Sequence, residues 1–424
     1  MPFGDAIHDA IETKKLGGEL SEEIISAVVA GFTEGAIPDY QMASLLMAIF
    51  IRGMTYEETL ALTRAMADSG KRYSFPGSVD KHSTGGVGDK ISLTALPIAA
   101  ACGAPVAKLS GRGLGMTGGT IDKLESIPGF SATLSEDRFK RQVEEVGLAI
   151  GEAGELAPAD KKIYALRDAT GTVDSLPLIG SSIVSKKAAT GAGYLLYDVK
   201  SGSGAFMKTA EDARELAELL VRLSEDLGIR ASAVITDMDT PLGSAVGNAL
   251  EVRESLRFLA GGEVPDDLAH EARYVAARLL ELKGIPDPQS KVEEALSSGA
   301  AHEKFREFVR AQDGDADASD ALPVSSEVHE VPAPGGGYVA RFHARGIGRA
   351  ALALGAGRRK KGEEIDPGAG VEVLVKARDR VEHGEPVARL YGRRNVERAE
   401  ALAREALELS DEPVEAAPAI LDSL

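Results

Sequence analysis

The chain has 424 residues, and this length predicts two or three domains. Its formal net charge of −18 makes a nucleic-acid backbone or an anionic membrane a poor partner. The single Cys102 excludes an internal disulfide and is typical of a reducing cytoplasm, where we expect the protein to act. It lies in an apolar run and is interpreted as core packing. No signal peptide or bilayer-spanning apolar stretch is evident in the sequence.

The first 70 residues have helical periodicity. One helix is predicted to begin at Pro38 and to end at Gly53, and Thr55-x-x-Glu58 resembles a capping box that begins the next helix. The first of these helices is apolar on more than one side. Its predicted face carries Met42, Leu45, Leu46, Ile49 and Phe50. Two interpretations stay open: a buried core helix, or a helical interface between subunits.

From about residue 77, β-like runs alternate with helical patterns. Strands are expected near residues 106–109, 195–199 and 233–236, and a leucine-rich helix is expected from Thr209 to about Gly228. This alternation predicts an α/β domain with a parallel or mixed sheet. In such sheets, ligands bind beyond the carboxyl ends of the strands.

The last hundred residues have a different pattern. Residues 312–326 are acidic, small and rich in turn formers, and they are interpreted as a surface linker or a long loop. Residues 335–392 contain short strands separated by turns, including strands at 371–375 and 387–390. This part of the chain predicts a small C-terminal α+β module.

Two glycine-rich blocks, 81–89 and 110–120, follow strand-like runs. Glycine lets the chain turn tightly and present successive N–H groups to an anion. His82, inside the first block, is a candidate hydrogen-bond donor or proton carrier. The blocks and their surroundings also offer three hydroxyls and two ammonium groups, on Ser83, Ser110, Thr120, Lys81 and Lys108. The pattern predicts one anion pocket lined from two strand ends.

Familiar glycine-rich and carboxylate motifs fit these blocks less well. Residues 113–118 match the dinucleotide fingerprint in form, but a Pro-Gly pair at 128–129 cuts short the long helix that the fingerprint needs. Neither block contains the Gly-Lys-Ser/Thr of a P-loop. Glycines that only make tight turns would not explain the interleaved Lys, His, Ser and Thr. Asp122 and Glu125 could be the paired carboxylates of a glycosidase, but beside Lys123 they are interpreted as ion-paired and structural.

A third polar set lies at residues 164–168 and 181–187. If residues 180–190 are helical, Ser182 and Lys186 share one face of that helix. Arg167 and Lys186 could then bracket a planar polar ligand or a developing anion, and a solvated basic helix face is the alternative. A nucleophilic Ser–Lys hydrolase is disfavoured, because this set has neither the S-x-x-K spacing nor a G-x-S-x-G elbow.

Together these stretches resemble the second structural class of nucleoside phosphorylases, the thymidine and pyrimidine-nucleoside phosphorylases, over most of the chain. The matching segments are 81–89, 110–130, 156–161, 198–207 and 246–252. The resemblance implies a helical domain facing an α/β domain across a cleft that closes, with phosphate on the α/β side and the base on the helical side. It also implies a homodimer formed through the helical domain. The implied bounds are 1–68 and 157–192 for the helical domain, 74–156 and 193–325 for the α/β domain, and 326–424 for the C-terminal α+β module.

The same resemblance implies a set of site residues. Phosphate is expected on Lys81, Ser83, Ser92, Ser110 and Thr120, with Lys108 nearby. The pyrimidine ring is expected on Arg167, Ser182 and Lys186, while Leu114, Tyr164, Ile183 and Phe206 pack around base and sugar. The expected catalytic residues are His82, Arg167 and Lys186, which can stabilise charge on the departing base. A potassium ion is expected on backbone oxygens and one carboxylate, at Gly88, Lys90, Leu242, Ala245 and Glu254. Inorganic phosphate is the expected co-substrate, and no organic cofactor is implied.

The implied reaction is reversible phosphorolysis of uridine, thymidine and deoxyuridine, by direct attack of phosphate at C1′ with inversion. Lys108 favours the broad-specificity branch of the family. A strict thymidine phosphorylase, a related phosphoribosyltransferase and a non-catalytic phosphate-binding protein remain alternatives. Three departures from the family pattern, at Met116, Glu152 and Gly171, leave substrate preference open more than reaction type.

Overall fold

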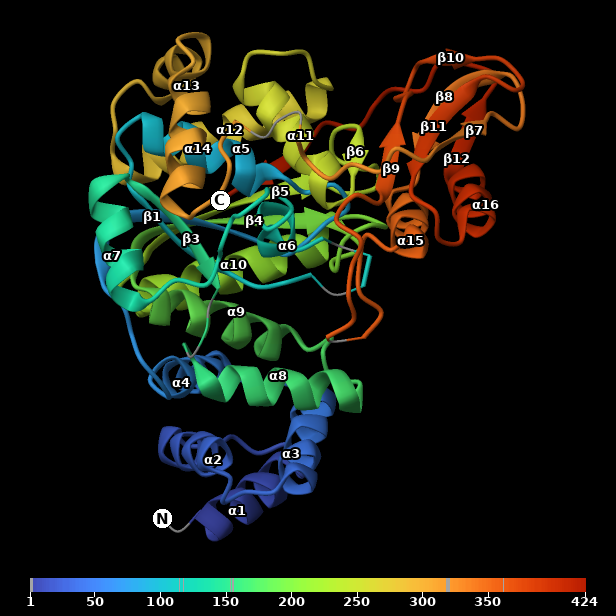
Figure 1. Ribbon diagram of the computed structural model, residues 1–424. Helices are drawn as coiled ribbons and strands as arrows, with labels where there is room; N and C mark the ends of the chain where they lie inside the picture. Colours follow the sequence, from blue (N-terminus) through green and yellow to red (C-terminus); the bar gives the residue numbers. More distant parts are fainter. Residues whose placement is uncertain are drawn as a thin grey trace. The chain divides into compact units, whose positions relative to one another are not determined.

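The computed structural model describes residues 3–113, 115–116, 118–152, 154, 156–317, 321–360 and 362–424 (Figure 1). The chain forms two compact units. The first, called the helical unit below, comprises residues 1–77, 153–193 and 218–231. The second, called the α/β unit, comprises residues 78–152, 194–217 and 232–424.

Local sequence sets several helix bounds in the helical unit. Ser21 caps α2 by accepting a hydrogen bond from the Ile24 amide, and Thr55 and Glu58 form the predicted capping box at the start of α4. The helices of this unit are α1 (Phe3–Lys15), α2 (Glu22–Glu34), α3 (Asp39–Arg52), α4 (Tyr56–Ala67), α8 (Pro158–Thr170), α9 (Leu176–Thr190) and the end of α10 (Ala210–Asp226). Helix α3 begins and ends where the sequence predicts.

Helix α3 buries one side and exposes another. Four residues of the predicted face, Met42, Leu45, Leu46 and Ile49, are at most 3% exposed and belong to the core of the helical unit. Phe50 was placed on the same face, but 39% of it is exposed. The core-helix interpretation is therefore confirmed for this face apart from Phe50. Tyr40, Met47 and Ile51 are the other exposed large apolar residues of α3, and the expected subunit interface stays a prediction.

A buried ion pair joins α1 to α4 within this unit. The Lys14 ammonium lies 2.7 and 2.8 Å from the two carboxylate oxygens of Glu58, and both side chains are less than 5% exposed. The same carboxylate accepts the backbone amides of Leu20 and Thr55, each at 2.7 Å. Four hydrogen bonds thus converge on one carboxylate and connect three segments of the chain.

We expect Glu58→Ala to lower the free energy of unfolding by about 3–5 kcal/mol, because the Lys14 ammonium would stay buried without its partner. Glu57→Ala is the matched control, since Glu57 is the exposed neighbour on the same helix. It should change stability by less than about 0.5 kcal/mol. Chemical denaturation measures both variants, and equal stabilities would contradict the assigned role of Glu58.

A six-stranded sheet forms the centre of the α/β unit, in the order β13-β5-β4-β1-β2-β3. Its strands are β1 (Phe75–Ser83), β2 (Val106–Ser110), β3 (Leu148–Glu152), β4 (Ala192–Ser201), β5 (Arg230–Asp237) and β13 (Ile420–Ser423). Strands β1, β2 and β3 are parallel neighbours, whereas β13 is antiparallel to β5. The sheet is therefore mixed, as predicted. Because β1 and β2 are adjacent and parallel, the two glycine blocks leave the sheet at the same edge.

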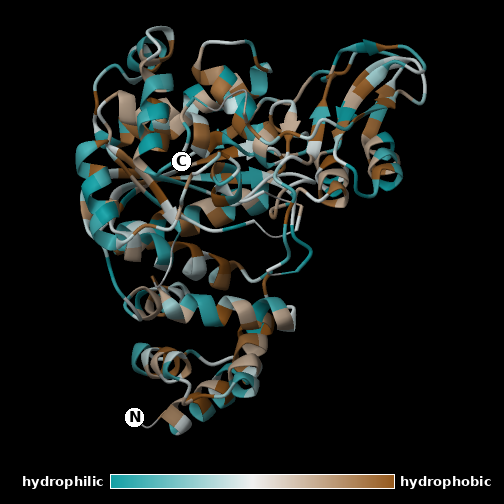
Figure 2. Ribbon diagram, in the orientation of Figure 1, coloured by the Kyte–Doolittle hydropathy of each residue, from teal (hydrophilic) through white to brown (hydrophobic). Residues whose placement is uncertain are grey.

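Helices cover this sheet and form the core with it. Helix α5 (Ile91–Ala101) is buried along nearly its whole length and packs against α11, α12, α13 and α14. The strands between such layers are apolar, and β3 is largely brown in Figure 2. The other helices are α6 (Thr120–Leu124), α7 (Glu136–Glu145), α11 (Asn248–Leu259), α12 (Asp266–Lys283), α13 (Pro288–Ser297) and α14 (Ala300–Ala311). The predicted cap of α10 is also present, because Thr209 accepts the Asp212 amide at 3.1 Å.

The C-terminal residues form the expected α+β module. One sheet has the order β10-β8-β12 and another the order β6-β9-β11-β7. The elements are β6 (Ala245–Val246), β7 (Val328–Pro332), β8 (Gly337–Phe342), α15 (Ala344–Leu354), β9 (Gly370–Val373), β10 (Arg380–Val381), β11 (Pro386–Tyr391), α16 (Val396–Ala406) and β12 (Leu407–Ser410). Strand β6 pairs with β9, so a loop from the middle of the chain completes a sheet of this module. The domain bounds given above stay predictions.

The expected surface linker at 312–326 is wrong at its start. Gln312 is 0% exposed, and its amide donates to the carbonyl oxygens of Ser131 and Ile150 at 2.8 and 2.9 Å. The Asp315 amide donates to Pro128 at 2.9 Å. Composition alone missed this because one glutamine satisfies buried backbone groups that lie far away in the sequence.

Candidate active site

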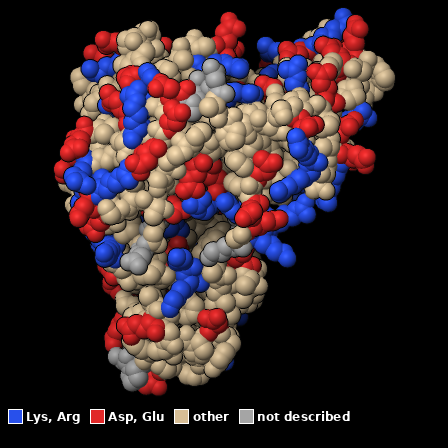
Figure 3. Space-filling view, viewed as in Figure 1, with Lys and Arg blue, Asp and Glu red and all other residues tan. Residues whose placement is uncertain are grey.

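The first glycine block places a buried ammonium group at the end of β1. Lys81 is 0% exposed, and its Nζ lies 2.6 Å from Asp198 and 3.6 Å from Asp89. Despite these ion pairs, the Lys81 ammonium has no hydrogen-bond acceptor of good geometry among the described residues. A buried cation with N–H groups left to donate suits an oxyanion. This buried site differs from the molecular surface, because basic and acidic side chains are interspersed on the face drawn in Figure 3.

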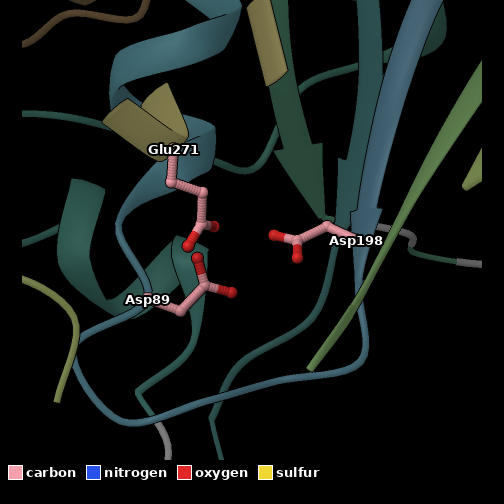
Figure 4. Close-up of side chains that lie close together, drawn as sticks. All are labelled: Asp89, Asp198 and Glu271. Atoms are coloured by element: carbon pink, nitrogen blue, oxygen red, sulfur yellow. The ribbon is translucent and has the colours of Figure 1, made fainter. Parts of the chain in front are cut away.

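Three carboxylates converge beside Lys81. Oxygens of Asp89, Asp198 and Glu271 lie within 4.8 Å of one another, and Figure 4 shows the side chains pointing together. Such a cluster could bind a metal ion, but the Lys200 ammonium already lies 2.9 Å from Asp198 and donates to Glu271. Two ammonium groups therefore face three carboxylates. We interpret the cluster as an ion-pair network that orients Lys81.

The network has one more carboxylate than it has ammonium groups, and this imbalance shifts the pKa values of its carboxyl groups. Burial, together with the charges of Asp198 and Asp89, raises the pKa of Glu271 to about 8 in spite of Lys200. Burial also acts to raise the pKa of Asp89, but Lys81 and the neighbouring lysines hold it well below its usual range. Glu271 is therefore the member of the network that takes up a proton.

We expect wild-type stability to fall more steeply than that of Glu271→Gln as the pH rises from about 5 to about 8. Between the usual carboxyl pKa of 4.5 and the raised value of about 8, the folded state holds this proton and the unfolded state does not. Stability then decreases with rising pH. Glutamine carries no titrating proton, so the variant lacks this component. Denaturation curves at several pH values measure the difference, and parallel pH profiles would contradict the assignment.

Lys108 supports the strand end rather than offering a free charge. It is 3% exposed, its ammonium donates to the carbonyl oxygen of Lys81, and it lies 3.5 Å from Asp80. The structure thus places it beside the expected phosphate residues. Its contacts fix the backbone that carries Lys81.

The expected phosphate hydroxyls lie at the sheet edge or next to it. Ser83 ends β1 and donates to Asp89. Ser110 is half-buried at the end of β2, Thr120 is half-buried at the start of α6, and Ser92 is 6% exposed in α5. All four hydroxyls belong to the α/β unit. Their binding role is untested by this geometry and stays a prediction.

The second glycine block is attached to the C-terminal module. Asp122 accepts the Gly113 amide at 2.7 Å and pairs with the Arg358 guanidinium at 2.8 Å. The Gly115 amide in turn donates to the carbonyl oxygen of Arg358 at 2.8 Å. A turn of the C-terminal module therefore shapes the glycine block from outside the sequence motif.

The structural role expected of Asp122 and Glu125 is correct, but the expected partner is not. Arg112 pairs with Glu125 at 2.5 Å and approaches Asp122 at 3.5 Å. Lys123 points elsewhere and pairs with the buried Glu251 at 2.7 Å. Adjacent residues on the short helix α6 face different directions, so proximity in sequence misidentified the pair.

Arg167 is committed to backbone carbonyls in the helical unit. Its Nε and two terminal nitrogens donate to Thr172, Leu178 and Val173, at 3.3, 2.9 and 2.7 Å respectively. The side chain is 1% exposed, and burial lowers its pKa. These bonds fix the turn between α8 and α9. They use three of the five N–H groups of the guanidinium, and the expected role of Arg167 at the pyrimidine ring stays a prediction.

Ser182 and Lys186 lie on one face of α9, as the spacing predicts. The Lys186 ammonium donates to Ser182 at 3.0 Å and to the Asp160 carboxylate of α8 at 2.6 Å. Asp160 is 3% exposed and Lys186 is half-buried. An ammonium has three N–H groups. These contacts use two of them, which leaves Lys186 one N–H to donate to a ligand. Nearby, Tyr164 is 42% exposed and Ile183 is half-buried.

Of the remaining predicted substrate residues, the two that the structure describes belong to the α/β unit. His82 is half-buried in the α/β unit, with its ring edge-on to that of Tyr197 at 6.2 Å. Phe206, also in the α/β unit, is 39% exposed. Leu114 lies outside the described residues. The contacts of these three residues with base and sugar stay predictions.

The expected potassium ligands come together, but Lys90 changes what they can bind. The Lys90 ammonium lies 2.6 Å from the Leu242 carbonyl oxygen and 2.8 Å from the Glu254 carboxylate. The sequence-based prediction used Lys90 as a backbone ligand of the ion. Its side chain instead brings a positive charge to the same oxygens, so this set of residues does not fit an added cation.

Comparison with known proteins identifies the family. A model of the glycosyl transferase family, a/b domain, matches residues 76–302, which is more than half of the chain. Models of the helical bundle domain of that family and of the pyrimidine nucleoside phosphorylase C-terminal domain match residues 8–70 and 338–410. The chain is 48% identical to pyrimidine-nucleoside phosphorylase of Bacillus subtilis (strain 168), over 91% of this chain and 92% of that relative. The chain belongs to this phosphorylase family.

Other family members agree with this result. Thymidine phosphorylase of Mycobacterium tuberculosis (strain ATCC 25618 / H37Rv) is 48% identical, over 98% of this chain and 97% of its own. Pyrimidine-nucleoside phosphorylase of Geobacillus stearothermophilus is 44% identical, over 98% and 99%. The crystal structure of anthranilate phosphoribosyltransferase from Thermus thermophilus has a TM-score of 0.58 at 23% identity, covering 72% of this chain and 99% of that one. That likeness shows a shared fold alone.

Several charged residues of this phosphorylase were missed by the sequence-based prediction. Asp198 and Lys200 lie in the family-like segment 198–207, and Lys200 pairs with Glu271 of α12. Asp160 of α8 was also missed, and it pairs with Lys186. The available signal was an Asp-Val-Lys sequence inside an otherwise apolar, buried strand. Charged residues are rarely buried unless they are paired.

The departure from the family pattern at Glu152 has a structural partner, because Arg112 pairs with it at 2.7 Å. Among the described helices, none is long and apolar enough to cross a membrane.

Proposed function

We propose that this protein catalyses the reversible phosphorolysis of pyrimidine nucleosides. A phosphate oxygen forms a bond to C1′ with inversion while the bond from C1′ to the base nitrogen breaks. The base leaves with that electron pair and takes up the proton that phosphate gives up, which yields free base and (deoxy)ribose 1-phosphate. Relatives named for this activity span more than 90% of both chains. The observation that carries the proposal is the buried Lys81 ammonium, with N–H groups left to donate.

The α/β unit is proposed to hold phosphate. Lys81 donates to the phosphate oxygens, and the hydroxyls of Ser83, Ser92, Ser110 and Thr120 add neutral hydrogen bonds. The Asp198 and Asp89 carboxylates hold the ammonium in place before phosphate arrives. A preorganised cation needs little reorganisation when the charged nucleophile binds. Lys108 acts through the backbone of Lys81.

The helical unit is proposed to hold the pyrimidine ring. Lys186 donates its third N–H to a ring carbonyl and stabilises the negative charge that grows there as the base departs. Arg167, Ser182 and Tyr164 complete the ring site, and the backbone bonds of Arg167 also position the turn between α8 and α9. His82 is proposed to donate to the O2 carbonyl. Fixing both reactants before the reaction removes the entropy of their encounter from the chemical step.

Uridine, thymidine and deoxyuridine are the proposed substrates. Support for this breadth comes from two relatives named pyrimidine-nucleoside phosphorylase. A relative of equal identity is named thymidine phosphorylase, which supports strict thymidine specificity as a second candidate. We also propose a cytoplasmic homodimer. Its expected interface includes the exposed apolar residues of α3. Inorganic phosphate is a substrate of the proposed reaction, and no potassium ion takes part, because Lys90 occupies the expected ligands.

The test is release of free base from uridine, thymidine and deoxyuridine, with and without inorganic phosphate. We expect all three to react only with phosphate and to yield one sugar 1-phosphate for each base. Activity on thymidine alone would establish the strict alternative. Base release without phosphate would indicate a hydrolase. A requirement for magnesium and diphosphate would indicate a phosphoribosyltransferase, and no release under any condition would leave a non-catalytic phosphate-binding protein.

A further inference from the structure

Lys90 occupies a pocket made of oxygens that would otherwise suit a monovalent cation. The side chain is 1% exposed. Its Nζ lies 2.6 Å from the Leu242 carbonyl oxygen and 2.8 Å from Glu254 Oε2. A carbonyl oxygen and a carboxylate are the ligands of hard cations. An ammonium group makes the same charge-assisted contacts with its N–H groups.

The surrounding backbone is folded closely around this ammonium. Gly243 has φ +68°, and a Cβ at this position would lie 2.9 Å from Lys90 Nζ and 2.7 Å from Glu254 Oε2. A Cβ on Gly88 would lie 2.7 Å from the Leu242 carbonyl oxygen and 3.1 Å from that of Ala245. Any larger residue at either position would enter the pocket. The two glycines thus leave a space that the ammonium fills.

Glu254 is fixed independently of Lys90. Its Oε1 accepts the Ser244 amide at 2.8 Å, and its Oε2 accepts the Ala245 amide at 3.1 Å. The carboxylate is therefore held by the 242–245 loop and is 5% exposed. Without an adjacent positive charge, this buried carboxylate would pay a large desolvation penalty. The pocket therefore requires a positive charge, and the ammonium group of Lys90 supplies it as part of the chain.

A second lysine binds the same loop from the other side. Lys376 donates to the carbonyl oxygens of Pro241 and Gly243 at 3.0 and 2.7 Å, and to Asp267 at 2.8 Å. Together with Lys90, it satisfies three consecutive carbonyl oxygens. Lysine ammonium groups thus bind the carbonyl oxygens of residues 241–243.

We propose that the Lys90 ammonium is a built-in replacement for a monovalent cation. It joins the residue that follows the first glycine block to the 242–245 loop, and it makes the folded protein independent of added potassium. The proposal concerns the folding of the α/β unit and stands whether or not the proposed function is correct. Its direct readout is thermal unfolding.

The test compares potassium chloride, ammonium chloride and tetramethylammonium chloride at equal ionic strength. Tetramethylammonium is too large for the pocket and cannot donate hydrogen bonds. We expect the wild-type unfolding midpoint to be the same in potassium and in tetramethylammonium. Lys90→Ala should unfold at a lower temperature in tetramethylammonium, and potassium or ammonium should restore much of the loss, because a small cation can enter the vacated space. Lys90→Met is the matched control. It fills that space without a charge, so it should be destabilised and show no recovery.

Two results would overturn the proposal. One is a wild-type midpoint that rises with potassium relative to tetramethylammonium, since this would show a cation site that Lys90 leaves open. The other is a Lys90→Ala variant whose midpoint does not depend on the identity of the cation. If Lys90→Ala does not fold in any of the salts, the potassium titration of the wild type decides the question. Phosphate binding is left out of the readout, so failure here and failure of the proposed function are distinguishable.

Discussion

Lys186→Met is expected to lower kcat/KM for uridine and thymidine by about 10²–10³, the usual cost of removing one donor to a developing oxyanion. Lys186 is half-buried on α9, with two N–H groups committed to Asp160 and Ser182 and a third left for the ring carbonyl. Methionine keeps most of the length and apolar character of the side chain. The variant loses the positive charge and the hydrogen-bond donor of Lys186. Steady-state phosphorolysis, followed by the ultraviolet change on base release, measures the effect.

Two control variants separate catalysis from folding. Lys161→Met removes an exposed lysine next to Asp160 on α8, so it matches the loss of one positive charge in the same unit. It should leave kcat/KM within about threefold of wild type, because exposed charges contribute little. Asp160→Asn keeps Lys186 and tests the buried carboxylate that positions it. If Lys186→Met lost activity only in proportion to its unfolded fraction, the assignment of Lys186 to the ring site would be wrong.

The parts that could be predicted from sequence depend on local rules. The capping box at Thr55, the start and end of α3 and the shared face of Ser182 and Lys186 each follow from residues within one or two helical turns. The glycine blocks were placed correctly beyond adjacent strand ends, because strand order in α/β sheets follows few patterns. The mixed sheet and the C-terminal α+β module are also confirmed, and they were predictable because sheets of this class follow few patterns.

The parts that could not be predicted depend on pairs that are distant in sequence. Lys200 and Glu271 are 71 residues apart, and Lys90 meets the Leu242 carbonyl across 152 residues. A lysine within a motif looks the same whether it faces a ligand or another segment of the chain. For this reason Lys90 was taken as a backbone ligand. The sequence likewise gave no sign that the Arg167 guanidinium donates to the carbonyl oxygens of Thr172, Val173 and Leu178.

Lys81→Met is expected to raise the KM for phosphate by at least about 10², equal to about 2.7 kcal/mol of lost binding energy for phosphate. It should also lower the free energy of unfolding by about 3–5 kcal/mol, because a buried ion pair is broken. Both effects follow from the position of its ammonium, 2.6 Å from Asp198 and fully buried. The stability loss alone would not show that Lys81 binds phosphate. The kinetic effect requires a comparison within the same network.

Lys200→Met provides that comparison. It removes the same charge from the same buried network, since Lys200 pairs with Asp198 at 2.9 Å and with Glu271. A purely structural role for Lys81 predicts equal stability losses and equal changes in phosphate KM for the two variants. A phosphate-binding role predicts similar stability losses, with a much larger change in phosphate KM for Lys81→Met. The phosphate dependence of the unfolding midpoint adds a readout without turnover, because a ligand stabilises only the state that binds it. Phosphate should raise the midpoint of Lys200→Met and leave that of Lys81→Met nearly unchanged.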